Sequence, residues 1–254
     1  MAADNGRIEE MSRFFVEQKD ILGGRAFVSG EDARHISAVL RLSRGDEATL
    51  CDGAGTDYRA RVERIEKDRV AFAILASSPS EAEPETRVTL FQGLPKAGKL
   101  EAVIQKCVEL GVYAISPVAA ARSVVRLTAK EFAGKLPRYQ KVACEAAKQS
   151  GRGIVPEVRG LARMDEIDPG AFDAFLLPYE GERRTTLRDA LRALDRPRTI
   201  GFAIGPEGGF EPDEVARLRE KGAACVTLGK RILRTETAGP AVLAMLLYEL
   251  EENA

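Results

Sequence analysis

The sequence predicts two joined folds, a small N-terminal β-barrel and an α/β domain built on a parallel sheet. Short alternating runs separated by turn residues fill the first part of the chain, about residues 12–78. A Pro- and Ser-containing acidic stretch without large apolar residues, 79–86, has the composition of a linker. Strand and helix patterns then alternate over 87–254, which is typical of a parallel sheet covered by helices on both faces. A chain of 254 residues is long enough for both domains.

The N-terminal region contains four runs in which apolar and polar residues alternate, and one short helical pattern at 32–40. The expected strands are 25–29, 47–51, 58–65 and 69–75. Turn signals separate them, among them Gly45-Asp46. This spacing favours a small barrel.

The region after the linker contains five apolar runs and five helical patterns in alternation. The expected strands are 88–92, 113–118, 174–177, 199–204 and 225–228, and the expected helices are 100–110, 137–150, 186–194, 212–221 and 237–251. Ligands of such sheets bind beyond the carboxyl ends of the strands, so we expect the loops after strands to carry the function.

The last expected helix has no charged residue from Ala238 to Tyr248. A helix that is apolar on every side must be buried on more than one face. A second copy of the chain would supply that cover, and the helix therefore favours a homodimer.

Charge is balanced overall, with 38 Lys and Arg against 39 Asp and Glu, but residues 90–160 hold 12 basic and 5 acidic residues. Helical spacing places several of these cations on common faces, a pattern that suits either phosphate contacts or a solvated surface. We slightly favour phosphate contacts. The residues concerned are Lys99, Lys106, Arg138, Lys141, Lys148 and Arg152.

The sequence gives little support for a metal site, a disulfide or a membrane-spanning segment. The four cysteines form no CxxC pair, which favours buried thiols over a zinc site, and His35 is the one histidine. No apolar run approaches the length of a membrane span, and the polar N-terminus lacks a signal-peptide pattern. We expect a cytoplasmic protein without a metal. The polar tail before Ser12 has no assigned role.

A phosphate-loop pattern, GxxxxGK, is present from Gly93 to Lys99. The following residue is Leu100 where a magnesium-binding Ser or Thr is needed, and the later strands do not end in Asp. A nucleotidase is therefore only an alternative hypothesis.

Two glycine-containing segments follow expected strands. GPEGG at 205–209 predicts a tight turn with exposed backbone groups, and residues 228–238 combine apolar side chains with Arg234, Thr235, Glu236 and Thr237. A backbone-lined apolar pocket with a few polar groups suits an adenosine-like ligand. The spacing is not that of a dinucleotide fingerprint.

At these residues the chain resembles the SPOUT superfamily, and more closely the bacterial 16S rRNA uracil-N3 methyltransferases. The matching motifs are HISAVLRL at 35–42, KLE at 99–101, ELGV at 109–112, EAAKQSGR at 145–152, GPEGG at 205–209 and LRTETA at 233–238. The resemblance implies a PUA-like barrel, a trefoil-knotted α/β domain, a homodimer, and 16S rRNA in the assembled small subunit as the partner.

The same resemblance implies S-adenosyl-L-methionine as the cofactor, bound by three loops. The implied residues are Leu177, Pro178, Ile204, Gly205, Pro206, Gly208, Gly209, Leu228, Gly229, Ile232, Leu233 and Thr237. Arg13 joins the six cations above as an expected RNA contact.

Two residues are candidates for catalysis. Uracil N3 must lose a proton, and Arg234 can stabilise the resulting negative charge because its guanidinium stays protonated. Glu236 can orient Arg234 or accept a proton through water. A structural ion pair is the alternative for both. An rRNA-binding protein without catalysis is the remaining alternative function.

Overall fold

The structure is a computed structural model that describes residues 12–96 and 98–251, and the tail before Ser12 and Ala97 therefore lie outside it. The chain forms two compact units. Unit 1 comprises the described residues up to Glu83 together with Gly151–Val155, and unit 2 comprises Pro84–Ser150 and the described residues from Pro156 onward. The chain thus enters unit 1 a second time, after about two fifths of unit 2 has been built.

Unit 1 is a curled six-stranded sheet in the order β1-β4-β5-β6-β3-β2. Its strands are β1 (Arg13–Phe15), β2 (Ile21–Leu22), β3 (Arg25–Ser29), β4 (Glu47–Cys51), β5 (Thr56–Ile65) and β6 (Arg69–Pro79). All pairs are antiparallel except β1 with β4. Alternate residues such as Val28, Leu50 and Phe72 face one apolar core, which is why the period-two pattern predicted β3, β4, β5 and β6. The short strands β1 and β2 were not predicted.

The expected helix at 32–40 divides in two. A short α-helix, α1 (Gly30–Arg34), continues into a π-helical turn at His35–Val39 (η2). Ile36 is fully buried in the core, whereas His35 is exposed.

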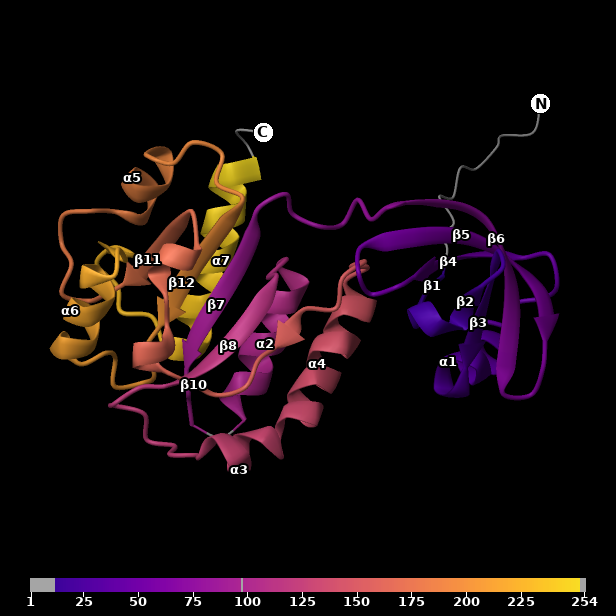
Figure 1. Cartoon of the computed structure of the whole chain (residues 1–254), viewed down its shortest axis with the longest axis horizontal. Coiled ribbons are helices and arrows are strands. Elements are labelled where there is room, and N and C mark those ends of the chain that lie inside the picture. The colour runs from indigo at the N-terminus through magenta and orange to yellow at the C-terminus, as the bar shows by residue number, and fades with distance from the viewer. Residues whose placement is uncertain (1–11, 97, 252–254) are drawn as a thin grey trace. The chain divides into compact units, whose positions relative to one another are not determined.

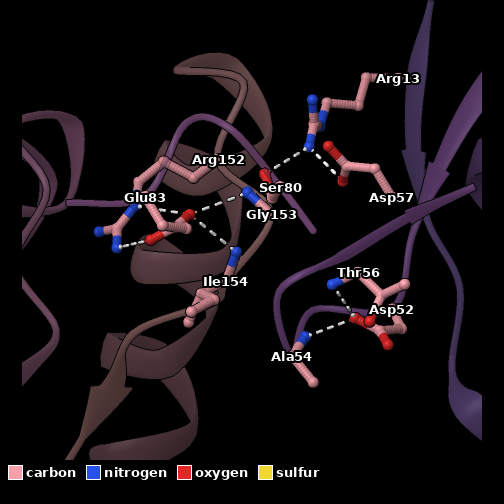
Figure 2. A network of polar contacts seen from close by, with 10 residues as sticks. All are labelled: Arg13, Asp52, Ala54, Thr56, Asp57, Ser80, Glu83, Arg152, Gly153 and Ile154. Carbon is pink, nitrogen blue, oxygen red and sulfur yellow. Dashed lines mark hydrogen bonds and ion pairs between the residues drawn. The ribbon is translucent and has the colours of Figure 1, made fainter. Parts of the chain in front are cut away.

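The carboxylate of Glu83 holds the segment Gly151–Val155 in unit 1 by hydrogen bonds (Figure 2). It accepts hydrogen bonds from the backbone N–H groups of Gly153 (2.9 Å) and Ile154 (3.0 Å) and from the guanidinium of Arg152. Isolated β-bridges also pair Ile154 with Gly53 and Ala54, in the turn that follows β4. We call Glu83 and Gly151–Val155 the Glu83 cage.

The placement of Arg152 on an exposed helical stripe is wrong. The preceding helix ends at Gln149, and Gly151 then takes a positive φ of 72° that turns the chain. The Arg152 side chain is 3% exposed and paired with Glu83, so it is not positioned to contact RNA.

Unit 2 contains a parallel sheet in the order β10-β8-β7-β12-β11-β13, with β9 also paired to β8. Its strands are β7 (Arg87–Gly93), β8 (Ala114–Ala119), β9 (Glu157–Val158), β10 (Ala162–Arg163), β11 (Ala174–Pro178), β12 (Thr199–Ile204) and β13 (Ala224–Val226). Every pair is parallel, so the carboxyl ends meet at one edge. The five expected strands are confirmed; β9 and β10 are too short to give a sequence pattern.

Helices cover both faces of this sheet, as predicted (Figure 1). They are α2 (Lys99–Glu109), α3 (Ala129–Ala133), α4 (Leu136–Gln149), α5 (Leu187–Arg192), α6 (Pro212–Glu220) and α7 (Thr235–Glu251). On one face α7 packs against α2, β7 and β12. On the other, Val215 and Leu218 of α6 pack with Phe91 and Leu177 of the sheet.

Helix α7 buries Val242, Leu243 and Leu246 completely, but Met245 and Tyr248 are 41% and 62% exposed. The helix is therefore apolar on a side that unit 2 leaves uncovered. In the described part of the chain no helix is both long and apolar enough to span a bilayer.

Cys51, Cys107 and Cys225 are buried thiols, as expected, whereas Cys144 is only partly buried. Burial raises the pKa of Cys51 to about 12, which keeps this thiol protonated and unreactive.

Candidate functional site

The candidate site lies at the carboxyl edge of the unit 2 sheet, where the segments after β11, β12 and β13 emerge. The turn after β12 is tight: a Cβ atom added to Gly205 would lie 3.0 Å from the carbonyl carbon of Gly209. Gly209 has a φ of +69°, which disfavours any other residue. Glycine at positions 205 and 209 is therefore required by the backbone of this turn.

A buried chain of hydrogen bonds fastens this turn to the start of α7. The Thr235 hydroxyl donates to the Gly205 carbonyl (2.7 Å) and accepts from the Gln92 amide (2.9 Å). Gln92 is completely buried at the end of β7. These hydrogen bonds join β7, the turn and α7. Gln92 and Thr235 were not among the predicted site residues, because nothing in the sequence pairs Gln92 with a residue 143 positions later.

A second connection, here called the Lys99 triad, consists of Lys99, Glu207 and Glu236. The Lys99 ammonium lies 3.1 Å from a carboxylate oxygen of Glu207 in the turn and 3.1 Å from one of Glu236 in α7. The backbone N–H of Lys96 also donates to Glu207. The expected role of Lys99 as a phosphate contact is therefore not supported, because its charge is already neutralised by two carboxylates.

The triad also fixes the charge state of its members. Hydrogen bonds to Glu236 and Glu207 raise the pKa of Lys99. Burial raises the pKa of Glu207, but the hydrogen bond from Lys96 and the Lys99 ammonium outweigh it and leave a lowered pKa. The pKa of Glu236 is lowered by its own backbone N–H, against desolvation, and then by Lys99. A carboxylate held in this way is a weak proton acceptor, and Glu236 contacts Lys99 instead of Arg234.

Arg122, in the loop after β8, fastens the other side of the turn. Its guanidinium binds Glu211 through two nitrogens (2.9 and 3.2 Å) and donates to the Gly208 carbonyl (3.2 Å). A Cβ on Gly208 would lie 2.9 Å from Cβ of Arg122. Sequence analysis did not single out Arg122, although it lies within the basic stretch.

The predicted cofactor residues fall into two groups. Leu177, Ile204 and Pro206 are buried, whereas Gly205, Gly208, Gly209, Leu228 and Gly229 present backbone at the edge. Beyond β13, Ile232 is 89% exposed, Leu233 is half-buried, and Arg234 and Thr237 are exposed around the start of α7. Pro178, at the end of β11, is half-buried.

The expected RNA contacts differ in availability. Arg138 and Lys141 are 73% and 74% exposed and form only surface ion pairs with Glu101 and Glu145, and Lys106 is exposed. Lys148 is half-buried. Arg13 is largely covered and binds Asp57 and Ser80, as Figure 2 shows. Arg13 therefore stabilises unit 1, and its guanidinium is not directed to solvent.

Among the described residues, no group of three or more His, Cys, Asp or Glu side chains could hold a metal ion. The phosphate-loop pattern at 93–99 leads into α2, but its Lys99 is taken up by the triad.

Comparison with known proteins favours the methyltransferase hypothesis over the nucleotidase and over an rRNA-binding protein without catalysis. Residues 82–247 match the family described as RNA methyltransferase domain, and residues 28–75 match the RNA methyltransferase PUA domain. The first match covers most of unit 2 and the whole carboxyl edge. The chain belongs to the ribosomal small-subunit methyltransferase E family of RNA methyltransferases.

Curated relatives and a solved structure agree with this placement. The ribosomal RNA small subunit methyltransferase E of Bacillus subtilis is 35% identical over 95% of this chain and 98% of its own length. That of Synechocystis is 31% identical, over 94% and 78%. The crystal structure of the Neisseria gonorrhoeae enzyme bound to S-adenosyl methionine superposes with a TM-score of 0.79 at 34% identity, covering 94% and 97% of the two chains.

Proposed function

We propose that this protein transfers a methyl group from S-adenosyl-L-methionine to N3 of a uridine in 16S ribosomal RNA. The observation that carries the proposal is the fastening of the Gly205–Gly209 turn to the start of α7 by two separate connections, the buried Gln92–Thr235 chain and the Lys99 triad. This arrangement holds backbone groups and the Arg234 segment in one rigid edge. Positioning supplies most of the catalysis in an in-line methyl transfer.

The residues at this edge suit the proposed cofactor. Adenosine needs an apolar pocket with backbone donors and acceptors, and the turn offers exposed backbone next to buried apolar side chains. We assign binding to Leu177, Pro178, Ile204, Gly205, Pro206, Gly208, Gly209, Leu228, Gly229, Ile232, Leu233 and Thr237. The cofactor supplies an electrophilic methyl group on a sulfonium.

Arg234 is the proposed catalytic residue. As N3 of the uracil loses its proton to water, negative charge spreads to the two ring oxygens, and an exposed guanidinium without a carboxylate in hydrogen-bond contact can stabilise it. No ion pair involves Arg234 among the described residues. Glu236, held by Lys99, is assigned to orientation of this segment and not to proton transfer.

Exposed cations on unit 2 are the proposed contacts for the rRNA phosphates. Arg138 and Lys141 extend from α4, and Lys106 from α2. Lys148, which is half-buried, completes the set. The surface ion pairs of Arg138 and Lys141 contribute little energy, and phosphate groups can replace their carboxylate partners.

The uncovered apolar side of α7 supports a homodimer as the active form. Met245 and Tyr248 would be buried by a second copy. Sedimentation velocity should then give about twice the mass of the 27.6 kDa chain. The trefoil knot, the assembled small subunit as substrate and a cytoplasmic location, all implied by the resemblance, belong to the same proposal.

Calorimetric titration tests the cofactor assignment first. The pure protein should bind S-adenosyl-L-methionine at micromolar concentration and should not bind ATP with Mg²⁺. Small subunits lacking the modification should then accept one labelled methyl group, and mass spectrometry of nuclease digests should identify 3-methyluridine. Methylation at another atom would refute the N3 assignment, and binding of ATP alone would restore the nucleotidase hypothesis.

A further inference from the structure

The segment after β11 carries a carboxylate to which the proposed function assigns no role. β11 ends at Pro178, and the exposed side chain of Glu180 follows it. This carboxylate lies beside the turn after β12, because a Cβ atom added to Gly209 would be 2.9 Å from its Oε1 atom and 3.6 Å from its Oε2 atom. In the part of the chain that the structure describes, Glu180 forms no hydrogen bond or ion pair. Its acceptor oxygens are therefore open to a ligand at the candidate site.

The other carboxylates at this edge of the sheet all have partners. The described segments after β11, β12 and β13, up to the first turn of α7, contain four more of them: Glu182, Glu207, Glu211 and Glu236. The Glu182 carboxylate accepts hydrogen bonds from the backbone N–H groups of residues 183, 184 and 185 (2.7–3.2 Å). Arg122 binds Glu211, and Lys99 binds the remaining two. Glu180 is thus the exception among the carboxylates of these segments.

The backbone around Glu180 is fixed without any contribution from its carboxylate. The Tyr179 N–H donates to the carbonyl of Val226 in β13 (3.0 Å), and the Glu182 N–H donates to the Tyr179 carbonyl (3.1 Å) and closes a turn. Inside this turn, a Cβ atom on Gly181 would meet the Tyr179 ring, so the chain is tightly packed there. A structural role for the Glu180 carboxylate is therefore not required.

The neighbouring cation is already occupied. Arg122 lies close enough to Glu180 for the carboxylate to raise the pKa of its guanidinium, although the hydrogen bond to Glu211 is the main cause. The same guanidinium donates to the Gly208 carbonyl. Arg122 therefore leaves the Glu180 carboxylate without an ion pair.

The chemistry of the carboxylate selects the part of the cofactor that it can bind. An ionised carboxylate has acceptors and no donor, so its partner must supply hydrogen-bond donors. The ribose of an adenosine carries two adjacent hydroxyl groups, which match the two oxygens of one carboxylate. Glu180 follows three residues after Leu177, which is buried and assigned to the apolar part of the cofactor site. Because ribose is bonded directly to adenine, a carboxylate next to this apolar surface suits the ribose.

We propose that Glu180 binds the two ribose hydroxyl groups of the methyl donor. This inference rests on the cofactor assigned under the proposed function and adds a specificity to it. The site should favour a ribonucleoside over the same nucleoside without its hydroxyl groups.

The test compares two ligands on two forms of the full chain. Adenosine and 2′,3′-dideoxyadenosine compete with S-adenosyl-L-methionine in a calorimetric titration of the natural protein and of Glu180→Gln. The natural protein should prefer adenosine by about tenfold or more, because hydrogen bonds to a charged group are the stronger kind. In Glu180→Gln most of this preference should disappear through weaker binding of adenosine, while the affinity for dideoxyadenosine stays the same.

Glu220→Gln is the charge-matched control, because Glu220 is an exposed glutamate at the end of α6. It should leave the preference for adenosine unchanged. Both variants should melt within about 2 °C of the natural protein, as surface substitutions usually do. A loss of ribose preference without a loss of stability is not explained by a structural role.

Three results would overturn the proposal. Equal weakening of adenosine and dideoxyadenosine in Glu180→Gln would indicate a distorted site. Weaker binding of S-adenosyl-L-methionine with an unchanged preference for adenosine would assign the carboxylate to the cationic end of the cofactor. Failure of the natural protein to bind adenosine or the methyl donor would remove the cofactor assignment as well. Because the titrations contain no RNA, absence of methyl transfer alone would refute the proposed function and leave this result standing.

Discussion

The Glu83 cage in unit 1 and the Lys99 triad in unit 2 use the same chemistry for different purposes. In both, a carboxylate accepts hydrogen bonds from a cation and from backbone N–H groups. The cage is closed: Arg152 is 3% exposed and Glu83 is 13% exposed. In the triad, Lys99, Glu207 and Glu236 are 24–29% exposed. The cage is therefore more deeply buried than the triad, as expected if the cage stabilises the fold and the triad orients the proposed site.

The largest expected effect is on the cage. Glu83→Gln removes the charge that compensates a buried guanidinium, and we expect the free energy of unfolding of unit 1 to fall by about 3 kcal/mol. Urea unfolding, with hydrogen exchange of β5 amides to assign the loss to unit 1, measures this. Glu81→Gln is the control, since Glu81 is exposed, and should change stability by less than about 0.5 kcal/mol. Equal effects of the two substitutions would show that the cage is not energetically special.

Arg234→Ala should affect catalysis and not folding. Loss of one group that stabilises the developing negative charge should lower kcat by about 100-fold or more. The dissociation constant for S-adenosyl-L-methionine should change little, as calorimetry would show. Arg231→Ala, in the same loop, serves as the control. If cofactor binding and kcat were lost together, Arg234 would be a structural residue.

Lys99→Met should give a smaller, intermediate effect. Without the ammonium, the turn at Glu207 and the start of α7 lose one of their two connections, and kcat should fall about tenfold with KM for RNA unchanged. Stability should change by less than about 1 kcal/mol, because the triad is partly exposed. Lys130→Met, an exposed lysine of α3, is the charge-matched control. A reduced salt slope of RNA binding in Lys99→Met would instead support the phosphate contact expected from the sequence.

The smallest effect concerns pH. The pKa values of Glu207 and Glu236 are lowered from an ordinary 4.5, and that of Lys99 is raised from 10.5. The triad thus contributes stability that is fully present between about pH 4.5 and 10.5, and that is lost as pH falls through the lower carboxylate values or rises through the higher lysine value. The difference in melting temperature between the natural protein and Lys99→Met should therefore be constant from pH 5 to 9 and shrink below pH 4.5. A difference that already declines between pH 8 and 6 would contradict this charge assignment.

The sequence predicted the elements whose signals are local. Period-two alternation located β3 and β4 to the residue, and turn residues marked their ends. The helix of 137–150 was expected within one residue of α4. Propensity and periodicity act over a few residues, so these features can be read directly.

The Arg152 prediction failed, and the Lys99 prediction lost support, because the partners of these residues are distant in the chain. Lys99 has its partners 108 and 137 positions later, so a count of local charge suggested an unpaired cation. Arg152 continues the helical spacing of α4, but the break at Gly151 directs it to Glu83, 69 positions earlier. Charge on a helix face therefore predicts a surface only when its tertiary partners are known.

The return of Gly151–Val155 to unit 1 limits how freely this protein can exchange parts with its relatives. A graft of residues 12–83 onto another methyltransferase unit would also need the Arg152-Gly153-Ile154 run at the end of a helix corresponding to α4, because Glu83 otherwise loses its donors. Recombination at the 84–86 boundary alone would separate the carboxylate from these groups. The two units are thus expected to be inherited together, although they form separate folds.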